Sequence, residues 1–253
     1  MPRIHPPGGE VSWPADEGVL GVVGVAPWAT LDFCRALYEQ VAAAKDWHYP
    51  RVLLDVNTKL PSRGRHLQLG ETDPSPAIAA TIRELAGQGA TLAVVVCNTA
   101  HILFERWSQQ SPIPVLDIVE ETIGATLAAG AALVTPFASR SLADSDLYGA
   151  AAQRQGLQVH RLAEPFQGWI SGFIEQIKVS GALGAAEHEK LGVLAGHLRD
   201  RGVDTVILAC TELSLLQAPL EELGLRTVDS NRSLARAALL RLGVGAEFLR
   251  TGS

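Results

Sequence analysis

Short apolar runs alternate with longer amphipathic segments along almost the whole chain. The runs that predict strands cover residues 18–24, 51–57, 91–97, 113–119, 131–135, 205–210 and 225–230. The segments that predict helices cover residues 27–44, 76–89, 146–156, 168–181 and 188–202. Strands and helices that alternate in this way favour an α/β fold with parallel sheets, in which strands buried on both faces are continuously apolar.

Two distant segments share one layout. Gly89 lies eight residues before Cys97, and Gly202 lies eight residues before Cys210. Each unit shows a helix, a glycine that ends it, an apolar strand, a cysteine and a new helix. Any two helix–strand units share this general layout. That general similarity does not readily explain why a cysteine stands at the same strand end in both units. We therefore expect two similar α/β halves, each with a cysteine at the carboxyl end of a strand, where ligands bind in open parallel sheets.

Composition excludes several classes of protein. The 253 residues carry a net charge of −6 without a cluster of Lys and Arg, which is unfavourable for binding nucleic acid or an anionic membrane. No apolar run reaches the ~18 residues of a membrane span. Residues 1–16 contain four prolines and no apolar signal-peptide core, so we expect a flexible tail there. Three widely spaced cysteines without a CxxC motif indicate free thiols and a cytoplasmic protein.

Motifs for cofactors and metals are missing from the sequence. There is no GxGxxG, no GxxxxGK[ST], no GxSxG, and the seven histidines form no HExxH or Cys/His cluster. We therefore expect neither a cofactor nor a metal site.

Cys97 and Cys210 are candidates for acid–base chemistry. A thiol between a strand and the first turn of a helix can have its pKa lowered by the helix dipole, which makes it a usable base. Two thiols that face each other can remove a proton from one side of a carbon and deliver a proton to the other. A single buried cysteine is more often a small core residue, and this is how we interpret Cys34, which lies inside the helix predicted over residues 27–44. For the matched pair the catalytic interpretation is the better one.

Polar residues follow both cysteines, namely Asn98 and Thr99 after the first and Thr211 and Glu212 after the second. These residue types cap helices and can also bind the amine and carboxylate of an amino acid. His101, one turn beyond Cys97, either tunes that thiol or packs in the core.

These motifs resemble a known family. Residues 97–101 (CNTAH) and 209–213 (ACTEL) are similar to the paired signatures of the aspartate/glutamate racemase family, which does not use pyridoxal phosphate. Residues 24–33 and 57–63 are similar to two further segments of that family. The resemblance implies two pseudo-symmetric α/β domains, each a parallel sheet flanked by helices, with the active site in the cleft between them. It also implies a homodimer.

The resemblance also implies roles for individual residues. Cys97 and Cys210 would be the two acid/base groups. The α-carboxylate and amine of the substrate would be held by Asn98, Thr99, Thr135 and Thr211. Asn57 and Arg63 would meet a side-chain carboxylate, for which arginine offers a bidentate fork. Glu212 stands where aspartate-type members carry Glu, and it would orient a neighbour, contact the amine or serve only as an acid at a helix start.

Some positions depart from the family pattern. They are Val25, Ala26, Trp28, Lys59 and Ser62. We expect them near the substrate, so they leave the identity of the amino acid open.

From these observations we predict a first domain of residues 17–117 and 212–253 and a second of residues 118–211. The predicted activity is cofactor-independent racemisation or epimerisation of an acidic or related amino acid. The alternatives are a maleate-type isomerase, which also keeps two cysteines, a malonate decarboxylase, which keeps one, and a non-catalytic amino-acid-binding protein. A thiol-redox protein is disfavoured by the cysteine spacing.

Overall fold

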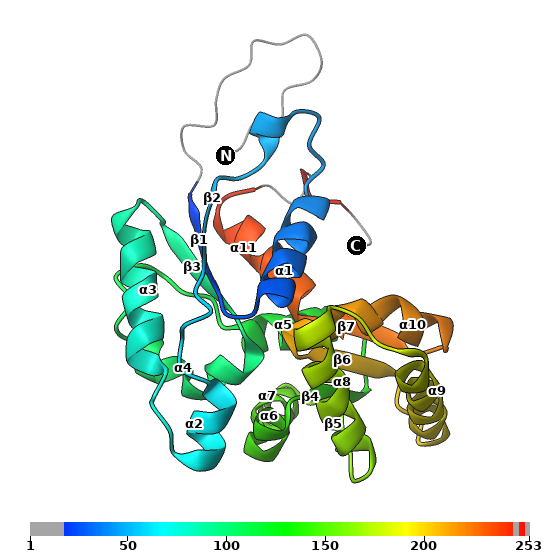
Figure 1. Cartoon of the computed structure of the whole chain (residues 1–253). Coiled ribbons are helices and arrows are strands. Elements are labelled where there is room, and N and C mark those ends of the chain that lie inside the picture. The colour runs from blue at the N-terminus through cyan, green and yellow to red at the C-terminus, as the bar shows by residue number, and fades with distance from the viewer. Residues whose placement is uncertain (1–17, 245–247, 251–253) are drawn as a thin grey trace.

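Two parallel sheets, each covered by helices, form the protein. The computed structural model describes residues 18–244 and 248–250 (Figure 1). The first sheet has the order β2-β1-β3, and its strands are β1 (Leu20–Gly24), β2 (Val52–Val56) and β3 (Leu92–Val96). The second has the order β5-β4-β6-β7, and its strands are β4 (Leu133–Ala138), β5 (Gln158–Val159), β6 (Thr205–Ala209) and β7 (Arg226–Asp229). Every pairing is parallel, so the predicted α/β class with helix-flanked parallel sheets is confirmed.

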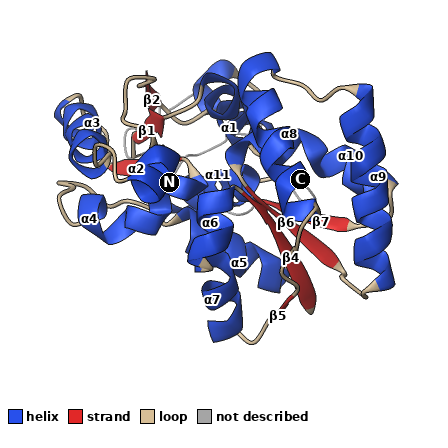
Figure 2. Cartoon of the chain, turned by 60° about the horizontal axis from the view of Figure 1, so that its bottom comes forward, coloured by secondary structure: helices blue, strands red, loops and turns tan. Residues whose placement is uncertain are grey.

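Helices connect the strands of both sheets. Those in the first part of the chain are α1 (Pro27–Glu39), the 3-10 helix η1 (Asp46–His48), α2 (Arg63–Leu69), α3 (Ser75–Gly87), the 3-10 helix η2 (Asn98–Leu103), α4 (Phe104–Ser108) and α5 (Ile118–Ala128). Those that follow are α6 (Arg140–Ser145), α7 (Leu147–Arg154), α8 (Phe166–Ser180), α9 (Ala185–Asp200), the 3-10 helix η3 (Thr211–Leu216), α10 (Gln217–Glu222) and α11 (Ser230–Arg241). Figure 2 shows how helices lie on both sides of the second sheet.

Alternate residues of the strands face different cores, as the pleat of a strand requires. Val206 and Leu208 of β6 pack under α8 and α9, whereas Ile207 lies in a core that also contains Val94 of β3. This second core, which we call the shared core, contains residues of both sheets together with Leu234 of α11. A third core lies on the outer face of the first sheet, beneath α3 and α4. The shared core therefore holds the two sheets together.

The two similar units of the sequence form two similar structures. β3 leads through Cys97 into η2 and α4, and β6 leads through Cys210 into η3 and α10. Both cysteines have extended backbone angles, with φ −165° and −147°. Gly89 and Gly202, which follow α3 and α9, have positive φ values of 102° and 72°. Glycine adopts this conformation at little cost, and both helices end there as predicted.

Two predicted elements differ from the structure. Residues 113–119 do not form a strand, because the prolines at 112 and 114 lack the N–H groups of a ladder and only Val115 bridges to Ala93. The helix α5 begins instead at Ile118, where Asp117 Oδ1 accepts a hydrogen bond from the Val119 N–H. The helix predicted over 27–44 ends at Glu39.

The end of the chain also departs from the domain division that the sequence predicts. β7 lies in residues 212–253, which we assigned to the first domain, but it pairs with β6 and so extends the second sheet. α11 then returns to contact α1 and β3.

The predicted tail, residues 1–16, lies outside the described residues. Among the helices that the structure describes, each is too short or too polar to cross a bilayer.

Leu234→Ala should destabilise the protein by about 2–5 kcal/mol, because it opens a void in the shared core. Leu240 lies on the same helix and is 47% exposed, so Leu240→Ala should change the unfolding free energy by no more than about 0.5 kcal/mol. Denaturant unfolding of both variants measures the difference. Equal losses would contradict the structural role given to the shared core.

Candidate active site

One cavity of about 480 Å³ contains both cysteines of the repeated units. Cys97 follows β3 of the first sheet, and Cys210 follows β6 of the second. The carboxyl ends of strands from both sheets thus contribute to one hollow, the position that open parallel sheets use for ligands. We call it the two-cysteine cavity. It is lined by Ser62, Arg63, Gly64, Arg65, Gln68, Cys97, Asn98, Thr99, Ser139, Arg140, Ser141, Ser171, Ile174, Glu175, Lys178, Cys210, Thr211 and Glu212.

Beside Cys97, Asn98 is buried and held on both ends of its amide. Its Nδ2 donates to Ser230 Oγ at 2.9 Å, and its Oδ1 accepts from the Tyr148 hydroxyl at 2.6 Å. Burial raises the pKa of Tyr148, which keeps that hydroxyl protonated as the donor. Thr99 Oγ1 lies 2.9 Å from Ser139 Oγ, which joins the segment after β3 to the segment after β4. The polar wall around Cys97 is therefore fixed by the fold.

The Cys210 thiol is buried and donates a hydrogen bond to Glu212 Oε2 at 3.0 Å. The Thr211 hydroxyl donates to the same oxygen at 3.2 Å. Burial raises the pKa of Cys210 well above its usual range, and the charge and hydrogen bond of Glu212 raise it further. The charge of Lys178 opposes this rise, whereas that of Cys97 adds to it.

For Cys210 this result corrects the expectation that a helix start would lower the thiol pKa. The dipole of a short 3-10 helix does not compensate for a buried sulfur next to a carboxylate. Burial and the neighbouring carboxylate therefore favour the protonated thiol, which makes Cys210 a candidate proton donor.

Arg63 differs from the other cations of the two-cysteine cavity. Arg65 pairs with Glu71, Arg140 with Glu164, and Lys178 Nζ lies 2.9 Å from Glu175 Oε1. Arg63 donates only to the Pro61 carbonyl, its Nε is buried without a hydrogen-bond partner, and no ion pair to it is found among the described residues. Among the cations that line the cavity, Arg63 is therefore the one without an ion pair inside the described residues, and it is the candidate to bind a carboxylate there.

Most of the site residues expected from the sequence lie in this cavity, including Arg63, but two do not line it. Thr135 is fully buried in β4, and its hydroxyl donates to the His160 carbonyl at 2.9 Å. Asn57 donates from Nδ2 to Thr81 Oγ1 at 3.1 Å. Both side chains thus use their polar groups within the protein, which the residue type alone does not indicate.

His101 packs beneath Cys97. Its Nδ1 lies 2.9 Å from the Cys97 carbonyl oxygen, and its ring stacks on Phe104 at 5.4 Å. Burial lowers the pKa of His101, so the ring is neutral and positions the backbone of Cys97.

The departures from the family pattern fall mostly outside the cavity. Of the five, only Ser62 lines it, and Ser62 Oγ also caps α2 by accepting from the Arg65 N–H at 3.3 Å. Trp28 lines a different cavity.

The residues that α8 and the end of β4 add to the cavity were not predicted from the sequence. Ser171, Glu175 and Lys178 recur at helical spacing along one side of α8. That polar stripe was visible in the sequence, but nothing there indicated what it faces.

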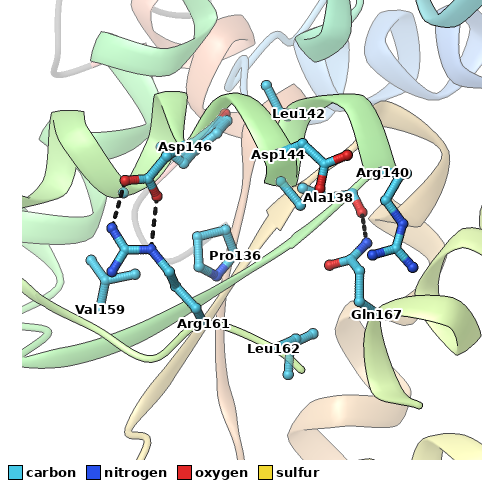
Figure 3. Close-up of a pocket in the computed structure, with 13 residues that line it drawn as sticks. Pro136, Ala138, Arg140, Leu142, Asp144, Asp146, Val159, Arg161, Leu162 and Gln167 are labelled. Carbon is cyan, nitrogen blue, oxygen red and sulfur yellow. Dashed lines mark hydrogen bonds and ion pairs between the residues drawn. The ribbon is translucent and has the colours of Figure 1, made fainter. Parts of the chain in front are cut away.

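A smaller cavity of about 140 Å³ lies beside α6 and shares Arg140 with the two-cysteine cavity (Figure 3). On one side of it Arg161 pairs with Asp146, with Nε 3.0 Å from Oδ1, and on the other Gln167 Nε2 donates to the Ala138 carbonyl at 2.9 Å. These contacts hold the two ends of the segment that brings Ser139 and Arg140 to the active site.

No three His, Cys, Asp or Glu side chains within the described ranges lie together as metal ligands.

Fold and cavity together define an α/β protein with two thiols, one from each sheet, in a polar cleft. The model of the Asp/Glu/Hydantoin racemase family matches residues 21–238. The chain therefore belongs to this family, whose members are isomerases of the racemase class.

Individual relatives agree with this assignment. A glutamate racemase of Ralstonia nicotianae is 26% identical over 203 residues, which are 73% of this chain and 70% of the relative. The solved structure of Picrophilus torridus aspartate racemase superposes with a TM-score of 0.81 at 22% identity and covers 92% of this chain and 95% of its own. A structure described as a putative Asp/Glu racemase from Yersinia pestis gives a TM-score of 0.73 at 19% identity, over 89% and 99% of the two chains.

The environment of Cys210 predicts opposite effects of two substitutions on its thiol pKa. In a Cys97→Ser background, Glu212→Gln should lower the pKa of Cys210, because it removes a negative charge next to the thiolate. Lys178→Met should raise it, because it removes a positive charge. The pH dependence of Cys210 alkylation by iodoacetamide, followed by peptide mass spectrometry, measures both. Shifts of the same sign would contradict the electrostatic assignment.

Proposed function

We propose that this protein is a cofactor-independent racemase or epimerase of an acidic amino acid, with Cys97 and Cys210 as its two acid/base groups. The observation that carries the proposal is the pair of thiols, one after β3 and one after β6, in a single cavity. Inversion of a carbon needs proton transfer on both of its faces, and two thiols from separate sheets can provide it.

In one direction the thiolate of Cys97 removes the proton from Cα, and the Cys210 thiol donates its own proton to the other face. In the reverse direction the roles exchange. The raised pKa of Cys210, caused by burial and by Glu212, supports its role as the first donor. Donors of the cavity wall stabilise the carbanion by binding the α-carboxylate, where negative charge develops. Asn98, Thr99 and Thr211 are the residues that we assign to this task.

An acidic side chain explains the state of Arg63. Arg63 lines the cavity and has no ion pair among the described residues, so its guanidinium can pair with a carboxylate that enters there. Aspartate and glutamate are the substrates named for the two relatives above, which favours the same class here. We assign the substrate ammonium group to Glu212, next to Thr211, and its positive charge would ease the ionisation of Cys210.

The proposal includes a homodimer in the cytoplasm. The free state of Cys34, Cys97 and Cys210 is the support for a reducing compartment.

Racemisation requires exchange of the α-hydrogen with solvent. We expect the protein, incubated with L- or D-aspartate or glutamate in D₂O without added cofactor, to incorporate deuterium at Cα and to form the opposite enantiomer. Proton NMR and chiral chromatography measure the two events. A protein that binds these amino acids in a thermal-shift assay but exchanges no α-hydrogen would be a binding protein instead. Conversion of maleate to fumarate, or release of CO₂ from a malonate, would indicate one of the other two activities.

Either cysteine substitution should abolish inversion. Cys97→Ser and Cys210→Ser should each lower the racemisation rate by about 10²-fold or more, because each removes one proton-transfer group. Cys34→Ser is the matched control, since Cys34 lies on α1 and packs against the shared core. Full racemisation by either of the first two variants would refute the two-base assignment.

Arg63→Gln should lower kcat/KM for acidic amino acids by about 10–100-fold, since a hydrogen bond to a charged group contributes about 1.5–3 kcal/mol. Arg65 lies two residues away but is 61% exposed and paired with Glu71, so Arg65→Gln should have little effect. Initial rates with both variants measure the contrast. Equal losses would remove Arg63 from the proposed substrate contacts.

A further inference from the structure

A second cavity, of about 280 Å³, lies behind the wall that carries Cys210. It is lined by Trp28, Ala29, Leu31, Asp32, Arg35, Ile177, Gly181, Thr211, Glu212 and Leu215. Trp28 and Leu31 are 51% and 55% exposed, so solvent reaches this hollow from the α1 side. We call it the rear cavity. Neither cysteine of the active site lines it.

Thr211 and Glu212 line both cavities and form the partition between them. The carboxylate of Glu212 is largely buried, and its Oε2 accepts the Cys210 thiol at 3.0 Å. Glu212 therefore touches the catalytic sulfur with its carboxylate and also lines a hollow that is open to solvent and separate from the substrate cavity. The other charged residues in the two linings are Arg63, Arg65, Arg140, Glu175 and Lys178 on the substrate side and Asp32 and Arg35 on the rear side.

After every turnover, a two-base racemase has to return its two thiols to their starting protonation states. Inversion breaks the Cα–H bond, forms an S–H bond on Cys97, breaks the S–H bond of Cys210 and forms a new Cα–H bond. The enzyme is left with a Cys97 thiol and a Cys210 thiolate, the opposite of its starting state. Before it can act again on the same enantiomer, Cys210 must gain a proton and Cys97 must lose one.

We propose that Glu212 returns the proton to Cys210 from the solvent of the rear cavity. In this step the carboxylate of Glu212 takes a proton from water in the rear cavity and passes it to the Cys210 thiolate, which restores both the Cys210 thiol and the Glu212 carboxylate. Cys97, which is half-buried, releases its proton on the substrate side. One proton enters and one leaves, no electrons are transferred, and the inference rests on the proposed racemase function.

The position of Trp28 fits this role. A methyl group added at Gly181 would meet the Trp28 indole at 3.4 Å, so the ring lies over the end of α8. Trp28 therefore forms part of the rear-cavity wall without entering the substrate cavity. This accounts for a bulky residue at a position that the sequence alone associates with the substrate.

The test separates the reset from inversion. When both enantiomers are present at high concentration, turnover is limited by the interconversion of the two protonation forms of the free enzyme. The interconversion rate is obtained from racemisation progress curves at rising substrate concentration and from tracer-perturbation experiments with isotopically labelled substrate. kcat/KM at low substrate reports inversion alone.

Three variants are compared with the wild type. Glu212→Gln keeps an acceptor for the thiol but cannot carry a proton, and it should slow the interconversion by about 10²-fold. Leu215→Trp adds bulk to the rear cavity only, and it should slow the interconversion while kcat/KM at low substrate stays unchanged. Val179→Trp adds the same bulk on α8 at a position that is 85% exposed and lines neither cavity, so it should change neither quantity.

Slower interconversion in the first two variants, with Val179→Trp unchanged, supports the relay. Normal interconversion in Glu212→Gln or in Leu215→Trp, in an enzyme that still racemises, overturns the relay alone. A wild-type protein that racemises no acidic amino acid overturns the proposed function and the relay together.

Discussion

The core shared by the two sheets is the constraint on which the active site depends. Val94 of β3 and Ile207 of β6 lie in one apolar cluster, and α11 packs into it after leaving β7. Because the strands are rigid and parallel, fixing their inner faces also fixes the positions of their carboxyl ends. Cys97 and Cys210 are the residues that directly follow those ends. The burial of apolar surface thus sets the geometry of the two thiols.

The polar groups around the thiols show how the same fold gives the two halves different chemistry. Around Cys97, the Asn98 amide is held between Tyr148 and Ser230, and Thr99 meets Ser139. Around Cys210, a carboxylate lies within hydrogen-bond distance of the sulfur and favours the protonated thiol. The repeated backbone units therefore differ in electrostatics, and this asymmetry gives one thiol a defined starting state.

Parts of the fold could be predicted because their signals are local. Continuous apolar runs, the glycines at 89 and 202 and the repeated cysteine spacing depend on neighbouring residues, and they appear in the structure as expected. The strand predicted over residues 113–119 was wrong, because prolines in an apolar run lack the N–H groups that a β-ladder needs. Residues 212–253 were assigned to the first domain, although β7 pairs with β6 of the second sheet, because that pairing is decided by packing and not by the four residues of β7. Thr135 is a similar case, since the His160 carbonyl that accepts its hydroxyl belongs to another segment.

By itself, the sequence determined the α/β class, the two cysteine units and the family to which the chain belongs. The signals for these features, which are apolar runs, helix termini and short motifs, depend only on residues that are close together in the sequence. Only the tertiary structure decided which polar groups share a cavity, that Arg63 has an unpartnered nitrogen, and that Glu212 stands between two hollows. These facts depend on distances between residues remote in sequence and on the burial that shifts their pKa values. Both are set by packing.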